Sequence, residues 1–212
     1  MSAILPLLMI LILAACIGVL FPEGLWSNAI RLVNVVTAAL VAMNFWEPMA
    51  RWLEGLNDFF ASITYFLDFL CLWALFAVTV LVMRIATGMV SHVKVRFLKV
   101  VDRSGSALFA FCVGWVMVCF TMTTLHTAPL SPKFLWGGFD PSQKMVFGLG
   151  PDRQWLGFVQ YASKGPLARS EPVVFDPDNK FMETYNNRRG ALDKYVEEKK
   201  TRRVGAGEAP KR

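Results

Sequence analysis

Charged residues are scarce in the first 128 of the 212 residues. This part holds 7 of the 22 Lys and Arg residues and 6 of the 16 Asp and Glu residues. The basic residues elsewhere lie among acidic ones, and no dense basic block interleaved with aromatic residues is present. This pattern argues against a nucleic-acid-binding protein, although the formal net charge is +6.

Residue patterns typical of metal sites and of catalysis are also missing. The chain has two histidines, and its four cysteines form no C-x-x-C pair: Cys16, Cys71, Cys112 and Cys119. It has no glycine-rich phosphate loop, no H-E-x-x-H and no G-x-S-x-G motif. Residues 176–179 look like the start of a calcium loop but lack its central glycine and closing glutamate, which favours a turn. We therefore expect no metal, no cofactor and no enzymatic activity, and we interpret the cysteines as packing residues.

Four long apolar runs are present instead, at residues 3–21, 25–46, 63–83 and 107–128. A helix needs about 20 residues to cross a hydrocarbon core of about 30 Å. The runs therefore predict an all-α polytopic membrane protein with four transmembrane helices in residues 1–128.

Two amphipathic segments and a polar tail complete the chain. We expect residues 47–60 to form an interfacial helix. Residues 84–102 favour a basic amphipathic helix, although a strand or a continuation of the third span is also compatible with the pattern. Residues 129–212 are expected to be an extramembrane tail. Within it we expect a short helix at 153–163 that could rest on the membrane, a charged helix at 179–203 that Gly190 weakens, and disorder from 204 to 212.

The first apolar run has an alternative interpretation. Residues 13–16, Leu-Ala-Ala-Cys, look like a bacterial lipoprotein cleavage box in which Cys16 would be acylated. However, the run continues to Phe21, and no Lys or Arg precedes it. We therefore expect an uncleaved span without lipid on Cys16.

Small residues recur on one face of the fourth run, at Ser106, Ala110 and Gly114. A spacing of four lets a neighbouring helix approach closely, so these residues are candidates for helix packing. Thr121, Thr123, Thr124, His126 and Thr127 cluster at the far end of the same run. They could line a polar mouth, but hydroxyls in helices more often bond to their own backbone.

Four charged residues in or next to the runs are candidate intramembrane polar groups: Arg31, Asp68, Asp102 and Arg103. A charge at membrane depth is costly unless it reaches the headgroups or has a partner. Arg31 could anchor the second span at the interface or make a polar contact inside the bundle. We expect Arg31 and Asp102 to lie at similar depth and to pair directly or through water, with Asp68 near the opposite face.

The orientation follows from the distribution of basic residues. The connection between the third and fourth spans carries five of them: Arg84, Lys94, Arg96, Lys99 and Arg103. Basic connections tend to stay in the cytoplasm. Four spans then place both termini in the periplasm.

The chain resembles the colicin V production protein family, a group of small bacterial inner-membrane proteins with four predicted spans. The resemblance rests on Gly24 followed by Arg31, on the aromatic segment after the second span, and on Asp102-Arg103 opening a helix. Family members carry glycines at spacing four after this pair, and here only Gly114 keeps glycine.

The family is linked to colicin V production or export and to envelope physiology, but its name implies no biochemical activity. We expect a non-enzymatic membrane protein that packs in the lipid bilayer with itself or with another membrane protein. The alternative is a small transporter or channel component that uses the polar residues of the spans.

Overall fold

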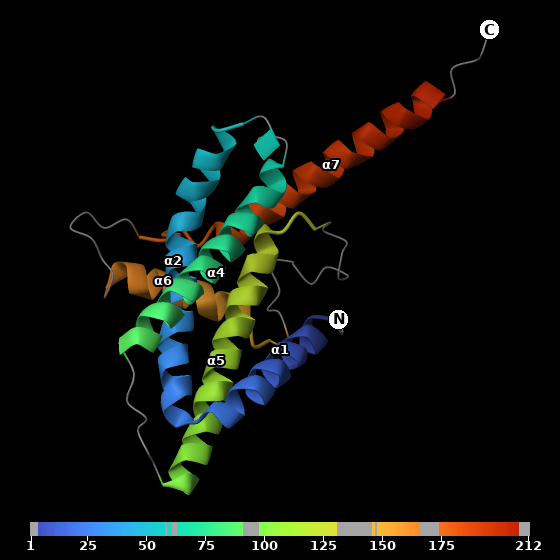
Figure 1. Ribbon diagram of the computed structural model, residues 1–212. Coiled ribbons are helices and arrows are strands. Elements are labelled where there is room, and N and C mark those ends of the chain that lie inside the picture. The colour runs from blue at the N-terminus through green and yellow to red at the C-terminus, as the bar shows by residue number, and fades with distance from the viewer. Residues whose placement is uncertain are drawn as a thin grey trace.

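The computed structural model describes residues 4–57, 59–60, 63–90, 98–130, 146, 148–165 and 174–207 (Figure 1). In chain order its helices are α1 (Ile4–Leu20), the 3-10 helix η1 (Phe21–Glu23), α2 (Leu25–Glu54), α4 (Thr64–Val90), α5 (Lys99–Thr127), α6 (Pro151–Lys164) and α7 (Phe181–Gly207). No strand occurs among these residues, and the predicted all-α class is confirmed.

Four helical segments are long and apolar enough to cross a membrane: Ile4–Glu23, Leu25–Glu54, Thr64–Met89 and Lys99–Thr127. They confirm the four predicted spans, and the chain is a multi-pass membrane protein. In α1 the large apolar side chains of Leu7, Ile10 and Leu11 are exposed on the protein surface. A helix that is apolar all round fits an apolar environment, which the lipid of a bilayer supplies.

The second span is longer than predicted. Residues 47–54 do not form a separate interfacial helix but continue α2 through Pro48. Proline removes one backbone hydrogen bond and normally weakens a helix interior. Here the flanking turns are held by tertiary packing, because Met43, Trp46 and Ala50 are all buried.

The other helix boundaries also extend beyond the predicted ones. Residues 84–90 continue α4, as one of the alternatives for the basic stretch proposed, while residues 91–97 lie outside the described part. The charged helix α7 passes through Gly190 and extends to Gly207. Residues 208–212 lie outside the described part.

Helix α5 packs against α1, α2 and α6, and α2 packs against both α4 and α5. The fully buried Ala38, Ala39 and Ala42 of α2 allow neighbouring helices to approach closely. Between α4 and α5, the rings of Phe76 and Phe120 stack with centroids 4.7 Å apart. We call the end of the bundle that holds Glu54, Thr64 and Thr127 the tail end, and the end that holds Gly24 and Asp102 the loop end.

The first part of the tail belongs to the same core. Trp155 and Val159 of α6, together with Phe181 and Tyr185 of α7, are buried in one cluster with residues of α2, α4 and α5. The distal part of α7 projects away from the bundle (Figure 1). The tail therefore docks on the spans through α6 and the start of α7.

Candidate functional site

At the loop end, Asp102 of α5 caps the first turn of α2. Its Oδ1 atom accepts a hydrogen bond of 3.0 Å from the backbone N–H of Leu25. The preceding residue, Gly24, has a φ of 88°, and a Cβ atom added there would lie 3.3 Å from the same Oδ1 atom. A side chain at position 24 would strain the backbone and crowd the carboxylate. A carboxylate at a helix N-terminus is also favoured by the helix dipole.

The predicted direct pair between Arg31 and Asp102 is wrong. Arg31 forms an ion pair with Glu23 of η1, and each side chain is about one-third exposed. Asp102 bonds to the backbone N–H of Leu25. The short turn between α1 and α2 instead brings Glu23 within reach of Arg31. Arg103 is exposed.

Ser106 connects α5 to both α2 and η1. Its hydroxyl donates a 2.7 Å hydrogen bond to the carbonyl of Phe21 and accepts one of 2.9 Å from the Asn28 side-chain amide. The same amide donates to the carbonyl of Leu20. Ser106 and Asn28 are both buried. This network joins three segments at the loop end with short side chains.

The other two small residues face the first span. Ala110 is fully buried beside Leu20. A Cβ atom at Gly114 would lie 3.2 Å from both Leu13 Cδ2 and Cys16 Cβ. The face that carries Ser106, Ala110 and Gly114 therefore lies against the α1–α2 hairpin.

Gly105 makes a close contact with Leu25 that the spacing of four between small residues did not predict. A Cβ atom there would lie 2.0 Å from Leu25 Cδ1 and 2.8 Å from Leu25 Cγ, so the leucine would have to move. Gly105 lies one position off the spacing of four, and so the repeat pattern did not include it. The sequence feature that could have indicated this contact is a glycine two residues after the Asp102-Arg103 pair.

A third polar contact joins α2 to α4. The Asn34 amide donates a 3.1 Å hydrogen bond to the Thr87 hydroxyl, which itself donates to the backbone carbonyl of Met83. Asn34 is buried. Asn28 and Asn34 thus connect α2 to α5 and to α4, respectively.

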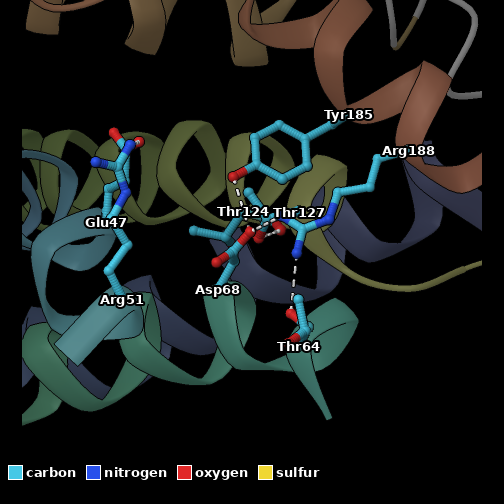
Figure 2. Close-up of polar contacts among 8 residues, drawn as sticks. All are labelled: Glu47, Arg51, Thr64, Asp68, Thr124, Thr127, Tyr185 and Arg188. Atoms are coloured by element: carbon cyan, nitrogen blue, oxygen red, sulfur yellow. Dashed lines mark hydrogen bonds and ion pairs between the residues drawn. The ribbon is translucent and has the colours of Figure 1, made fainter. Parts of the chain in front are cut away.

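At the tail end, Asp68 of α4 meets two side chains from α7. Asp68 is only 5% exposed and forms an ion pair with Arg188. The Tyr185 hydroxyl donates a 3.1 Å hydrogen bond to Asp68 Oδ2, and Arg188 also donates to the backbone carbonyl of Thr64. Figure 2 shows Tyr185 and Arg188 reaching from α7 toward Asp68. Asp68 therefore faces the interior, where a tail helix covers it.

Two side chains of α7, Tyr185 beside Asp68 and Arg189, have altered pKa values. Burial, followed by the nearby Asp68 carboxylate, raises the pKa of Tyr185 above its ordinary value. Burial also lowers the pKa of the neighbouring Arg189 to about 10. Tyr185 therefore stays a neutral hydrogen-bond donor at any physiological pH, and Arg189 keeps its charge. No pattern in the sequence connects Tyr185 and Arg188 with Asp68.

A cavity of about 540 Å³ lies beside Asp68. It is lined by residues of α2, the start of α4 and the start of α7, including Trp46, Glu47, Glu54, Phe181, Tyr185 and Arg188. Glu47 and Arg51 form an exposed ion pair at its edge (Figure 2). The lining mixes carboxylates, cations and aromatic rings at the tail end of the bundle.

The threonine-rich end of α5 is buried and packs against α6. The Thr123 hydroxyl donates to the carbonyls of Cys119 and Asp152, and the Thr127 hydroxyl donates to the carbonyl of Thr124. His126 Nε2 lies 3.1 Å from Asp152 Oδ2, with both side chains almost fully buried. These groups bond to their own helix and to α6, so this part of α5 does not line an open mouth.

The predicted turn at residues 176–179 directly precedes α7. Asp176 accepts hydrogen bonds from the backbone N–H groups of Lys180 and Phe181, at 2.8 and 3.1 Å. It therefore caps the helix N-terminus. All four cysteines are free. Across the described residues, no three His, Cys, Asp or Glu side chains are grouped so that they could hold a metal ion.

Comparison with known proteins gives one match. No curated protein and no solved structure shows a significant similarity to the chain. The family described as Colicin V production protein matches residues 5–138, which is more than half of the chain. The matched part includes all four spans and the loop-end contacts of Gly24, Asp102 and Ser106. On this match the chain belongs to the colicin V production protein family.

Proposed function

We propose that this protein is a non-enzymatic component of the bacterial inner membrane that acts by packing with itself or with another membrane protein. In this role it supports toxin production or export, or envelope homeostasis. The supporting observation is that polar side chains of the spans serve contacts between segments: Asn28 with Ser106, Asn34 with Thr87, Asp68 with Arg188, and Asp102 with the Leu25 backbone. Side chains used in this way hold helices together rather than bind a substrate.

A transporter or channel component is the second candidate, and the cavity beside Asp68 is the observation that favours it. Transport sites typically gather polar groups near the bilayer midplane. Here Asp68 lies at the tail end and Asp102 at the opposite, loop end. This separation favours the packing role.

The proposed orientation places the loop end in the cytoplasm, because Arg84, Lys99 and Arg103 lie near it. Both chain termini are then periplasmic. A reporter that is active only in the periplasm, fused after Arg212, is expected to be active. Activity of a cytoplasm-only reporter at the same position would contradict this orientation.

The two candidate functions respond differently to the loss of charge at Asp68. The double variant Asp68→Asn/Arg188→Gln removes both charges and keeps side chains that can hydrogen-bond. Under the packing role, it should restore colicin V production in a bacterial strain that lacks its own family member. The matched control is Glu23→Gln/Arg31→Gln, which removes an ion pair at the loop end.

Protein abundance in the membrane is measured beside activity for every variant. If the Asp68 double variant accumulates normally but fails to restore production, while the control succeeds, Asp68 handles a substrate and the packing role is wrong. Co-purification in a mild detergent, followed by identification of bound membrane proteins, then distinguishes a second copy from another partner.

A further inference from the structure

Helix α6 contacts α5 far from the end at which the chain leaves that span. The Trp115 indole donates a 3.2 Å hydrogen bond to Gln154 Oε1. The rings of Phe120 and Trp155 meet edge to face with centroids 6.1 Å apart. Closer to the tail end, the Thr123 hydroxyl donates to the Asp152 carbonyl. The first turns of α6 therefore lie alongside the second half of α5.

The rise of an α-helix converts these contacts into depth. Phe120 precedes Thr127, the last residue of α5, by seven residues, and Trp115 precedes it by twelve. At 1.5 Å per residue these positions lie about 10 and 18 Å below the end of the span. The hydrocarbon core is about 30 Å thick. In Figure 1, α6 crosses the bundle well below the upper end of α2.

Helix α6 has one face buried against the bundle and one exposed face with aromatic side chains, as expected for a helix at the depth of Phe120. Trp155, Val159 and Ala162 are buried against the bundle. On the outside, Phe158 is 41% exposed and Tyr161 is 68% exposed. At the depth of Phe120, the medium around a multi-pass protein is lipid, so this outer face fits acyl chains.

The polar groups of α6 are compatible with the same position. Asp152 is paired with His126, Gln154 with Trp115, and Gln160 donates to the backbone carbonyl of Asp176. Polar groups at membrane depth need such partners. The exposed basic residues, Arg153 and Lys164, lie near the two ends of the helix.

We propose that α6 is a membrane-embedded helix. After α5 leaves the bilayer, the chain returns and lays α6 inside the leaflet nearer the tail end, with Phe158 and Tyr161 against lipid. An exposed face that combines aromatic and basic residues is typical of helices lying below the headgroups. The extramembrane part of the tail then begins after Lys164. This assignment revises the division into spans at 1–128 and an extramembrane tail at 129–212.

The test compares two tyrosines of the wild-type chain, Tyr161 of α6 and Tyr195 of α7. Both are well exposed on the protein surface, at 68% and 56%. The purified full chain is placed in lipid nanodiscs that hold a single copy and is footprinted with hydroxyl radicals generated in the water. Mass spectrometry reads the oxidation of each tyrosine. We expect Tyr161 to be oxidised several-fold more slowly than Tyr195.

The single-copy nanodisc separates lipid from protein as the cover of this face. Equal oxidation of both tyrosines would overturn the proposal, because Tyr161 would then face water. Protection of Tyr161 only in nanodiscs that hold two copies would also overturn it, because a second copy would be the cover.

A Phe158→Cys variant tests the proposal independently. A membrane-impermeant maleimide should label the new cysteine slowly. Rapid labelling above the wild-type background would contradict the embedding of α6.

Discussion

The two ends of the bundle are held together by different kinds of contact. At the loop end, Asp102 and Ser106 are short side chains that bond to backbone groups of the α1–α2 turn. At the tail end, Arg188 reaches Asp68 from a helix 120 residues further along the chain. The loop end is therefore complete within the spans, whereas the tail end is complete only when α7 is docked. The tail is part of the structure of the membrane domain, because it neutralises a buried carboxylate there.

The largest expected effect comes from breaking the tail-end ion pair. Arg188→Ala leaves the buried Asp68 carboxylate without its cation, and loss of one partner of a buried pair costs about 3–5 kcal/mol. Because Arg188 is itself partly exposed, we expect the lower end of this range. Thermal unfolding in detergent measures the loss. Arg103→Ala, which removes an exposed arginine, is the control. Equal stability of the two variants would show that the tail end does not depend on this pair.

The next effect tests the close packing between α1 and α5. Gly114→Leu adds a side chain where a Cβ atom would already lie 3.2 Å from Leu13 and Cys16, and overpacking of this kind costs about 1–3 kcal/mol. Gly88→Leu is the matched control, because no atom lies within 4 Å of a Cβ atom there. Thermal unfolding in detergent should separate the two variants. A silent Gly114→Leu would mean that α1 can move away without cost.

A smaller effect tests the cap at the loop end. Asp102→Ala removes the acceptor of the Leu25 N–H, and loss of a helix cap typically costs about 1 kcal/mol. Asp102→Asn keeps an acceptor oxygen and should recover most of the loss. Since Arg31 pairs with Glu23, the effects of Arg31→Ala and Asp102→Ala should add within about 0.5 kcal/mol. A larger coupling in the double variant would restore the pairing predicted from the sequence.

The smallest effect is expected at the exposed pair beside the cavity. Glu47 and Arg51 are spaced i, i+4 on α2, with side chains 54% and 75% exposed. Pairs of this kind contribute about 0.3–0.5 kcal/mol. The double variant Glu47→Ala/Arg51→Ala should therefore unfold close to the wild-type temperature. A loss as large as that of Arg188→Ala would show that α2 and α7 are coupled through this pair.

The spans could be predicted because their signal is local. A run of about 20 residues with almost no charge has to be helical in a bilayer, where each backbone group needs a partner within its own segment. The same logic identified the small-residue face of α5. Extension of α2 through Pro48 to Glu54 was not predictable in this way. Glu47-Pro48 predicts a helix break from neighbouring residues alone. The packing of Trp46 and Ala50, which keeps the helix continuous, depends on residues far away in the chain.

The partners of the polar side chains could not be predicted from the sequence. Depth alone made Arg31 and Asp102 plausible neighbours, but similar depth does not specify direction around a helix. The actual partner of Arg31 is Glu23, and Asp102 bonds to a backbone N–H. For Asp68, the partner Arg188 lies in a tail whose apolar stripe, Phe181 and Tyr185, was too weak to indicate where it docks.

By itself, the sequence determined that this chain is a four-span helical membrane protein, because span length, charge and small-residue spacing act within a single helix. Only the tertiary structure decided that Asp68 is neutralised by α7, that Gly105 touches Leu25, and that α6 lies beside the middle of α5. These features join segments far apart in the chain. Their energies come from partners that no local pattern identifies, since the same arginine or aromatic residue is compatible with water, lipid or protein until the fold places it.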